Sequence, residues 1–134
     1  MAIITDDMRR IVQATRLCFV ATVDEDGTPN LSPKSSLMVY DDDHLLFANI
    51  ASPNTVQNLR RNPAIEINAI DIFARRGYRF KGTANMIPPG NPEYDFVAEP
   101  FWAGDRRSPP AVGTAPPPLV LGSKPSGIRR FGIR

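Results

Sequence analysis

Residues 44–63, HLLFANIASPNTVQNLRRNP, constrain the fold more than any other stretch of the chain. The apolar run at its start is typical of a buried strand, and the Ala-Ser-Pro sequence at 51–53 ends that strand. Ser52 or Asn54 can then cap a short helix over 55–61. This helix ends before Pro63, because proline disfavours a helical conformation in the residue that precedes it. The pattern predicts a strand that leads through a polar turn into a helix.

The start of this helix is a candidate anion site. The first N–H groups of a helix have no partner within it, and the helix dipole favours negative charge there, which suits a phosphate. The hydroxyl and amide side chains of Ser52, Asn54 and Thr55 are also the groups that cap ordinary surface helices. The turn alone leaves both interpretations open.

The rest of the chain predicts a meander of short strands. Strands are expected at 17–23, 28–32, 34–40, 44–50, 64–70 and 78–87. Residues 24–27, DEDG, form the turn between the first two. Pro29 and Pro33 place the second strand at an edge or interrupt it, because each lacks a donor for the ladder. Six strands in this order, with one inserted helix, point to a small β-barrel with helices on its rim.

Two further helices are expected beside the barrel. Thr5 or Asp6 can cap the first of them, which turns Ile11 and Val12 inward. Asn91 can cap the second, over 91–101, since a proline follows it at the first helical position.

The amino-acid composition of the chain changes near residue 102. Residues 1–102 are expected to form one domain, and 103–134 a Pro/Arg-rich segment of uncertain order that holds six of the 14 prolines. The net charge of +2 is uneven, because 106–134 carry six basic and no acidic residues. Only PLVLG at 118–122 is typical of a strand, so 106–134 are expected to add little to the core beyond Leu119 to Leu121. A basic arm for nucleic acid is an alternative role for this tail, but nucleic acid is not the partner we expect.

The absence of several known motifs narrows the range of possible functions. The sequence has no P-loop, GxGxxG, CxxC or HExxH motif, and His44 is its single histidine. A histidine-based triad or metal site is thereby excluded, and we predict no metal ligand. The three aspartates at 41–43 are typical of a solvated turn, because consecutive side chains point in different directions. A cofactor that brings its own chemistry stays possible, since the protein then supplies only binding, orientation and electrostatics.

Three features of the sequence predict a cytoplasmic protein that does not contact membranes. No run approaches the ~20 apolar residues of a membrane span. The N-terminal residues lack the basic start and apolar core of a secretory signal. Cys18 is the single cysteine, and its apolar surroundings in LCFVATV are typical of a small buried hydrophobe.

Three motifs, taken in order, resemble a known family. They are LCFVATVDEDGTPNLSPKSS, LLFANIASPNTVQNLRRNPAIEI and RRGYRFKGTA. They contain a D-x-x-G-x-P turn, a helix that closes with NLRRNP, and a strand of the R-x-x-G-T-A type. Together, over about residues 8–87, they resemble the FMN-binding split β-barrel group related to pyridoxamine 5′-phosphate oxidase. The implied fold is mainly β, a six-stranded antiparallel split barrel of the FMN-binding type with a few short helices.

The resemblance implies a homodimer with FMN in the clefts between subunits. The implied cofactor-binding residues are Ser32, Pro33, Lys34, Ser35, Ser36, Ala48, Asn49, Ser52, Asn54, Thr55 and Arg79, the last reaching the partner's flavin. The phosphate-binding positions at the helix start fall on 53–55, where the full oxidase often has Ser-Arg-Lys. This chain has Pro-Asn-Thr there, so Lys34 and the backbone are expected to bind more of the phosphate charge.

The function implied is that of an FMN-dependent oxidoreductase, acting on an unknown small molecule by hydride transfer at flavin N5. A deazaflavin is the alternative cofactor. A non-catalytic flavin-binding protein, for storage or sensing, is the alternative function. The substrate-binding C-terminal segment of the oxidase is not recognisable in this sequence, so vitamin oxidase activity is not expected.

Overall fold

The computed structural model describes residues 3–15, 17–49, 52–104, 119–122 and 127–132. The helices are α1 (Asp6–Ala14), α2 (Pro53–Arg61) and α3 (Tyr94–Gly104). The strands are β1 (Cys18–Val23), β2 (Pro29–Lys34), β3 (Met38–Val39), β4 (Leu45–Ala48), β5 (Ala64–Asp71), β6 (Arg76–Ile87), β7 (Leu119–Gly122) and β8 (Gly127–Gly132). The fold is mainly β, as expected, although the described residues form eight strands where the sequence predicted six.

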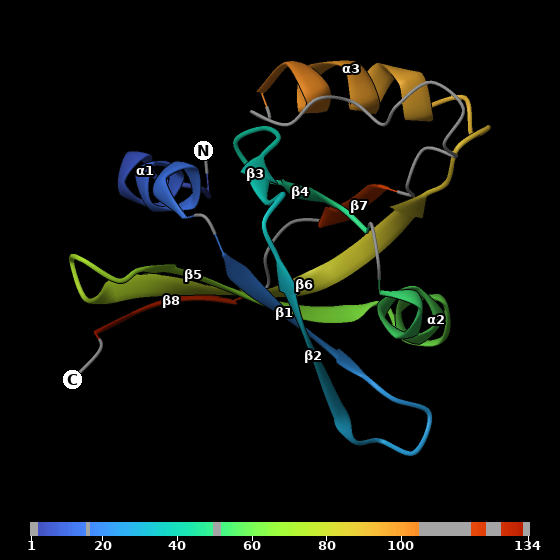
Figure 1. Cartoon of the computed structure of the whole chain (residues 1–134), viewed down its shortest axis with the longest axis horizontal. Helices are drawn as coiled ribbons and strands as arrows, with labels where there is room; N and C mark the ends of the chain where they lie inside the picture. The colour runs from blue at the N-terminus through green and yellow to red at the C-terminus, as the bar shows by residue number, and fades with distance from the viewer. Residues whose placement is uncertain (1–2, 16, 50–51, 105–118, 123–126, 133–134) are drawn as a thin grey trace.

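All the described strands belong to one antiparallel sheet. Its order is β2-β1-β5-β6-β7-β4-β3, and β8 pairs with β6 outside this path. The long strand β6 crosses the molecule and links β5 and β8 to β7 (Figure 1). It pairs with β5 on one side and, on the other, with β8 near its start and with β7 near its end. The three helices lie around the twisted sheet (Figure 1).

The predicted bounds of the second and third strands are wrong. Lys34 ends β2 instead of beginning the next strand, and β3 holds only 38–39 of the predicted 34–40. A side-chain contact explains why the residues between these two strands do not pair as a strand. Ser36 Oγ donates to the Ala48 carbonyl at 3.2 Å and accepts from the Ala48 N–H at 3.1 Å, so it replaces the ladder partner that a strand would provide.

The β1–β2 hairpin and its edge follow the sequence pattern. Gly27 has a φ of 85°, which favours glycine, and its N–H donates to the Asp24 carbonyl at 2.9 Å. Pro33 lies opposite Phe19, and Pro29 opposite Val23. Because β2 ends the sheet order, both prolines lie on an edge strand, as expected.

The C-terminal strands contribute to the sheet more than the sequence suggested. Strand β7 lies between β6 and β4. Its Leu119 and Val120 are fully buried, which confirms the prediction that this run can pack in the core. The wider expectation of a tail that adds little is wrong for β8, because β8 pairs with β6 and Ile128 packs against the core. The division at residue 102 stays a prediction, and 105–118 lie outside the described residues.

Helix α1 packs on the sheet and is fixed by one carboxylate. Its N-cap is Thr5, and Ile11 and Val12 are buried, both as predicted. Asp7 accepts from both Nη atoms of Arg76, at 2.7 and 2.8 Å, and from the Tyr78 hydroxyl at 2.6 Å. The hydrogen bonds from Arg76, Tyr78 and Arg10 hold the pKa of Asp7 well below its usual range. This carboxylate therefore ties α1 to the start of β6.

The other two helices differ from prediction at their first residues. Helix α2 begins at Pro53, with Ser52 as its N-cap. Helix α3 begins at Tyr94, because Asn91 first forms a turn in which its carbonyl accepts from the Tyr94 N–H at 2.9 Å. Across the described part of the chain, no helix has the length and apolar character that crossing a membrane requires.

Candidate functional site

Lys34 is a buried cation held by two hydroxyl groups. It lies with Ser32 on the inner face of β2, since both residues are buried and successive strand residues alternate between faces. Its Nζ donates to Ser32 Oγ at 2.7 Å and to Ser52 Oγ at 2.5 Å, and the two hydroxyl oxygens are 2.8 Å apart. Only 6% of Lys34 is exposed, and none of the ion pairs among the described residues includes it.

Burial makes the charge on Lys34 costly. Loss of hydration lowers the pKa of Lys34, whose partner on β1 is Cys18. Burial also raises the pKa of Cys18 to about 12, so the thiol is protonated at neutral pH and brings no counter-charge. A buried cation without a counter-charge is unfavourable. The ammonium would therefore be stabilised by a bound anion.

Helix α2 begins next to this ammonium. Its N-cap Ser52 makes no side-chain capping bond, and its hydroxyl is bonded to Lys34 and Ser32 instead. The N–H groups of Asn54 and Thr55 belong to the first turn, where helical donors have no partner within the helix. Thr55 is fully buried, and its Oγ1 has no hydrogen-bond partner among the described residues.

Asn49 adds a second unpartnered polar atom at the same turn. Its Nδ2 donates to the Ser52 carbonyl at 3.0 Å, which fixes the chain just before α2. Its Oδ1 is buried and, within the described residues, has no partner. A cation, two hydroxyls, a helix start and unpartnered polar atoms thus converge where β2 meets α2.

The other predicted residues near this point have supporting or separate positions. Ser36 and Ala48 are buried and bonded to each other, so they position the chain beside the site. Pro33 and Ser35 are exposed and alternate with the inward residues. The side chain of Asn54 is exposed at the helix start.

Arg79 is not part of this cluster within one chain. It lies on β6, exposed, and its Nε is 3.0 Å from Glu66 Oε1. The register runs from Phe19 through Asn68 to Arg79, which places Arg79 on the outer face of the sheet. Lys34, opposite Cys18, lies on the inner face. The structure therefore separates Arg79 from the other predicted residues.

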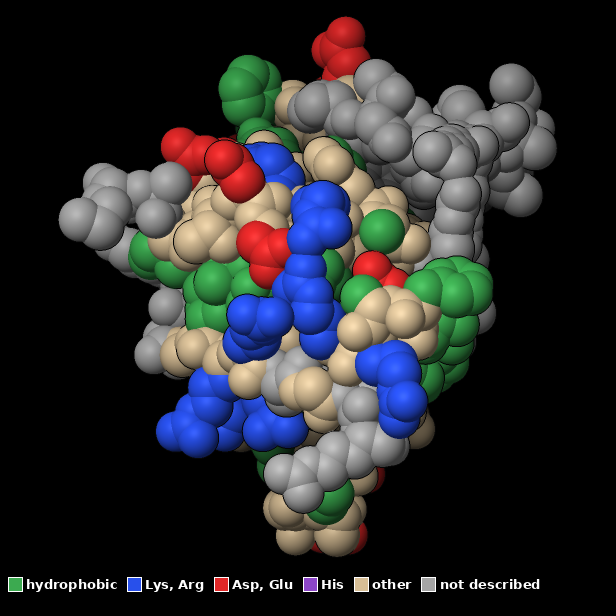
Figure 2. Space-filling view, turned by 90° about the vertical axis from the view of Figure 1, so that its left-hand side faces the viewer, with side chains coloured by type: hydrophobic (Ala, Val, Ile, Leu, Met, Phe, Trp, Pro, Cys, Tyr) green, Lys and Arg blue, Asp and Glu red, His purple; other side chains and the backbone are tan. Residues whose placement is uncertain are grey.

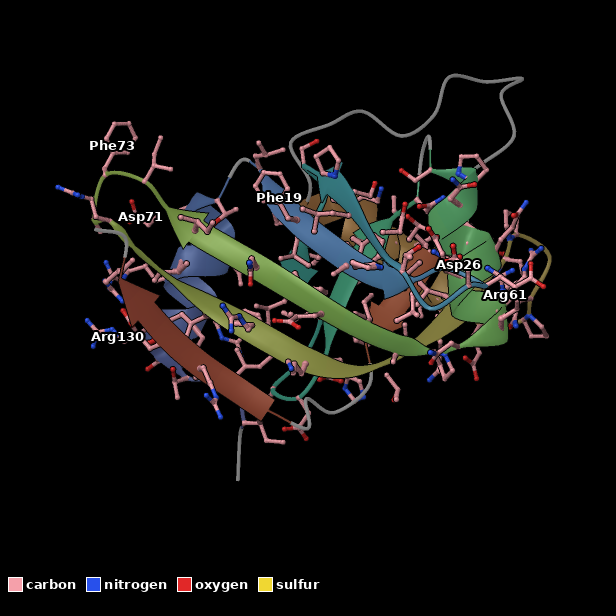
Figure 3. The ribbon with its side chains drawn as sticks, turned by 90° about the horizontal axis from the view of Figure 1, so that it is seen from below. Phe19, Asp26, Arg61, Asp71, Phe73 and Arg130 are labelled. Atoms are coloured by element: carbon pink, nitrogen blue, oxygen red, sulfur yellow. The ribbon has the colours of Figure 1, made fainter. Side chains whose placement is uncertain are left out.

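Sequence reasoning missed Asn58, which links α2 to the β1–β2 hairpin. Its buried side chain donates to Thr22 Oγ1 at 3.0 Å and to Asp24 Oδ1 at 2.7 Å, and accepts from Arg61 Nη2 at 2.7 Å. Figure 3 shows Arg61 and Asp26 close together at this end of the molecule, far from Phe73. An available signal was the position of Asn58 one turn after Thr55, on the buried side of the helix.

The acidic turn at 41–43 was predicted to be solvated, but all three of its aspartates make contacts with other residues. Asp41 Oδ1 is 2.7 Å from His44 Nδ1, and Asp42 pairs with Arg9 at 2.9 Å. Asp43 Oδ1 accepts from the Ile3 N–H at 3.2 Å. The described residues contain no group of His, Cys, Asp and Glu side chains that could hold a metal ion.

Comparison with known sequences finds a matching protein family and a curated relative. The model of the family described as pyridoxamine 5′-phosphate oxidase matches residues 4–121. An uncharacterized protein of Methanocaldococcus jannaschii, MJ0282, is 28% identical over 98 residues, which are 72% of this chain and 63% of that protein. The chain thus spans less than two thirds of the length of this curated relative.

Solved structures share the fold over nearly the whole chain. HupZ of Group A Streptococcus is 29% identical with a TM-score of 0.78, and the match covers 97% of this chain and 95% of HupZ. A pyridoxamine 5′-phosphate oxidase-related, FMN-binding protein of Nostoc punctiforme is 16% identical with a TM-score of 0.66, over 94% of this chain and 78% of that protein. At this low identity, the second likeness shows the fold alone.

Proposed function

The chain belongs to the pyridoxamine 5′-phosphate oxidase family, and we propose that it binds FMN, with the phosphate between Lys34 and the start of α2. The observation that carries this proposal is the buried ammonium of Lys34. It is bonded to Ser32 and Ser52 and pairs with no carboxylate of the described residues. A bound anion would offset the cost of burying a lysine in this position.

The groups around Lys34 fit a phosphate. Ser32, Ser52 and Thr55 offer hydroxyl donors, and the backbone N–H groups of Asn54 and Thr55 point from the helix start. The unpartnered Oγ1 of Thr55 gains a partner in this arrangement. Asn54 and Thr55 stand where the full oxidase often has two basic residues, so Lys34 provides the main positive charge, in charge-assisted hydrogen bonds.

We propose that the protein is an oxidoreductase that acts on a small molecule in the cytoplasm. When bound, FMN supplies hydride transfer at its N5 atom. The chain's part is to bind and orient the cofactor. Lys34 and α2 hold its phosphate end, and Asn49, with its unpartnered Oδ1, is proposed to contact the ring system.

We also propose a homodimer that covers the outer face of β1 and β2. This face carries Phe19 and Ala21 on β1 and the exposed Leu31 and Pro33 on β2. Leu31 is 64% exposed in the single chain, and burying such apolar surface favours association. A two-fold dimer would bring the same face of both subunits together.

The test is to identify what the purified protein binds. We expect a yellow protein whose denatured extract contains FMN by absorbance and by mass. A deazaflavin in the extract would support the alternative cofactor. A protein that contains neither compound, and that does not quench FMN fluorescence when FMN is added, would refute the proposal.

A second measurement separates an enzyme from a storage or sensor protein. Under anaerobic conditions, NADH or NADPH should bleach the bound flavin, and an electron acceptor should restore its colour. Bound flavin that no reductant or acceptor turns over would favour the non-catalytic alternative.

A further inference from the structure

The turn between β5 and β6 exposes two apolar side chains at one end of the molecule. Phe73 is 94% exposed and Ile72 is 69% exposed. Strand β5 ends at Asp71 and β6 begins at Arg76, so both side chains lie beyond the ends of these strands. The turn lies at the left edge of the molecule in Figure 1, and Figure 3 shows Phe73 directed away from the sheet. We call residues 71–75 the β5–β6 tip.

Hydrogen bonds hold the β5–β6 tip in this shape. The Oδ1 atom of Asp71 accepts from the N–H groups of Phe73 and Ala74, at 3.0 Å each. Arg75 has a φ of 55°, in the left-handed region that side-chain-bearing residues rarely adopt. A flexible loop could fold its apolar side chains back onto the protein, whereas this bonded turn keeps Phe73 in solvent.

Basic side chains lie beside the apolar ones. Arg75 belongs to the β5–β6 tip and is exposed, and Arg130 of β8 is exposed at the same end of the molecule (Figure 3). Among the described residues, no ion pair includes either of them. Figure 2 faces the side from which the tip projects, and Lys and Arg side chains gather across it. The tip thus combines an apolar end with positively charged surroundings.

This combination fits the surface of a bilayer that contains anionic lipids. Exposed apolar side chains are stabilised when they enter the boundary between headgroups and acyl chains, and cations beside them attract the anionic headgroups. The cytoplasmic leaflet carries such a negative surface potential. A second copy that met this tip with its own tip would bring like charges together, which opposes that contact.

We propose that the β5–β6 tip contacts anionic membranes, with Ile72 and Phe73 inserted at the interface and Arg75 and Arg130 at the headgroups. The expectation of no membrane contact came from the lack of a spanning segment and of a secretory signal, and a surface contact requires neither. This inference does not depend on the proposal that FMN binds at Lys34.

The experiment sediments the full chain with vesicles of phosphatidylcholine, with and without phosphatidylglycerol. We expect binding to the vesicles that contain phosphatidylglycerol, and weaker binding as sodium chloride is added. Phe73→Ser should raise the Kd for these vesicles by roughly tenfold or more, because the variant loses the burial of one aromatic side chain. Phe96→Ser changes an apolar residue on α3 that is also highly exposed, and should leave the Kd unchanged.

Two further measurements separate the parts of the proposed contact. Arg130→Gln should raise the Kd for the anionic vesicles by about fivefold, since one basic residue near the headgroups contributes about that factor. Phe73→Ser should keep the Tm and the FMN affinity of the parent, because Phe73 makes little contact with the folded chain.

Several results would overturn the proposal. A parent protein that sediments with neither kind of vesicle is one of them. Equal vesicle binding by the parent and Phe73→Ser is another, since the arginines alone would then explain it. A lower mass of Phe73→Ser by light scattering would assign the tip to a contact between copies, and loss of FMN affinity would assign it to the flavin site. A parent that binds these vesicles but no FMN would refute the FMN proposal alone.

Discussion

Asn58 Nδ2 donates to Asp24 Oδ1 at 2.7 Å, across 34 positions of sequence, and so joins the middle of α2 to the turn after β1. The same side chain bonds to Thr22 and Arg61. Strand β2, which follows that turn, carries Ser32 and Lys34 at the start of α2. The contact therefore sets the position of the helix relative to the candidate phosphate site.

Asn58→Ala should lower the free energy of unfolding by about 2 kcal/mol, because it removes the shorter of the two hydrogen bonds that the buried Thr22 hydroxyl accepts and the shorter of the two that the Asp24 carboxylate accepts from side chains. Urea unfolding at neutral pH measures this. Gln57→Ala, at an exposed position of the same helix, is the matched control and should change stability by no more than about 0.5 kcal/mol. Equal effects of the two variants would contradict the role given to Asn58.

Lys34→Ala should weaken FMN binding by about ten- to a hundredfold, because a hydrogen bond to a charged group contributes roughly 1.5–3 kcal/mol. Riboflavin, which has no phosphate, should bind nearly as well to the variant as to the parent. Fluorescence titration with both ligands measures the two affinities. The fold should persist, since Ser32 and Ser52 remain bonded to each other at 2.8 Å.

Lys34→Met tests the same contact with the side-chain volume retained. It should lose FMN affinity like Lys34→Ala, without lowering the Tm of the flavin-free protein, because it removes a buried charge. If both variants bind FMN as tightly as the parent, Lys34 is not a phosphate ligand.

Asp7 should make stability depend on pH in the acid range. Its pKa is depressed in the folded protein, mainly by Arg76. A depressed carboxyl pKa adds stability that is complete above the unfolded value, about 3.9, and is lost as pH falls toward the lower folded value. Asp7→Asn should therefore be less stable than the parent at pH 6, and the difference should shrink between about pH 4 and pH 2. Urea midpoints across this range test it, and a constant difference would exclude the linkage.

Strand β7 should be required for folding. A chain that ends at residue 118 lacks Leu119 and Val120, which are both fully buried, and leaves β4 and β6 unpaired where β7 joins them. We expect it to lose cooperative thermal unfolding by circular dichroism. A chain that ends at residue 126 keeps β7 and should unfold cooperatively at a lower Tm. Equal melting of the parent and the chain ending at 118 would restore the view of a dispensable tail.

Leu31→Asp should shift the proposed dimer toward monomers, because it places a charge on the outer face of β2. Light scattering after size-exclusion chromatography reports the mass. Phe96→Asp changes a comparably exposed apolar residue on α3, where Phe96 is 77% exposed, and should leave the mass unchanged. A parent protein that is monomeric with full flavin occupancy would contradict the dimer itself.

The sequence predicted the elements whose patterns are local. The buried run at 45–48 and the stop before Pro63 depend on neighbouring residues, and the structure confirms both. Ser52, one of the two predicted caps, takes the N-cap position but makes no side-chain capping bond. Strand β8 was missed because GIRRFG has no strand-like alternation by itself. It is ordered by pairing with β6, whose paired residues lie 46 to 56 positions earlier in the chain.

The sequence predicted those residues of the candidate site that belong to local motifs. It did not predict the contacts that depend on how distant elements pack together. Lys34, Ser52 and Thr55 were predicted from two motifs, and the structure bonds Lys34 to Ser52 and places Thr55 in the first turn of the helix that follows. The bonds of Lys34 to Ser32 and Ser52 depend on how β2 crosses the start of α2, which no local pattern contains. The partners of Asn58 were missed for the same reason, since they lie on β1 and in the turn after it, although the spacing of Asn58 from Thr55 placed it on the buried side of α2.

The prolines of β2 affect how readily this protein aggregates through its sheet edge. Pro29 and Pro33 lie on a strand that ends the sheet, and residues two or four apart direct their backbone groups to the same side. Proline fits an edge strand when its missing donor faces away from the ladder. The free edge of β2 thus lacks two of the N–H groups that an incoming strand would need, and it is a poor template for aggregation. Replacing either proline would add a donor to that edge, and amyloid-type pairing between copies could begin there.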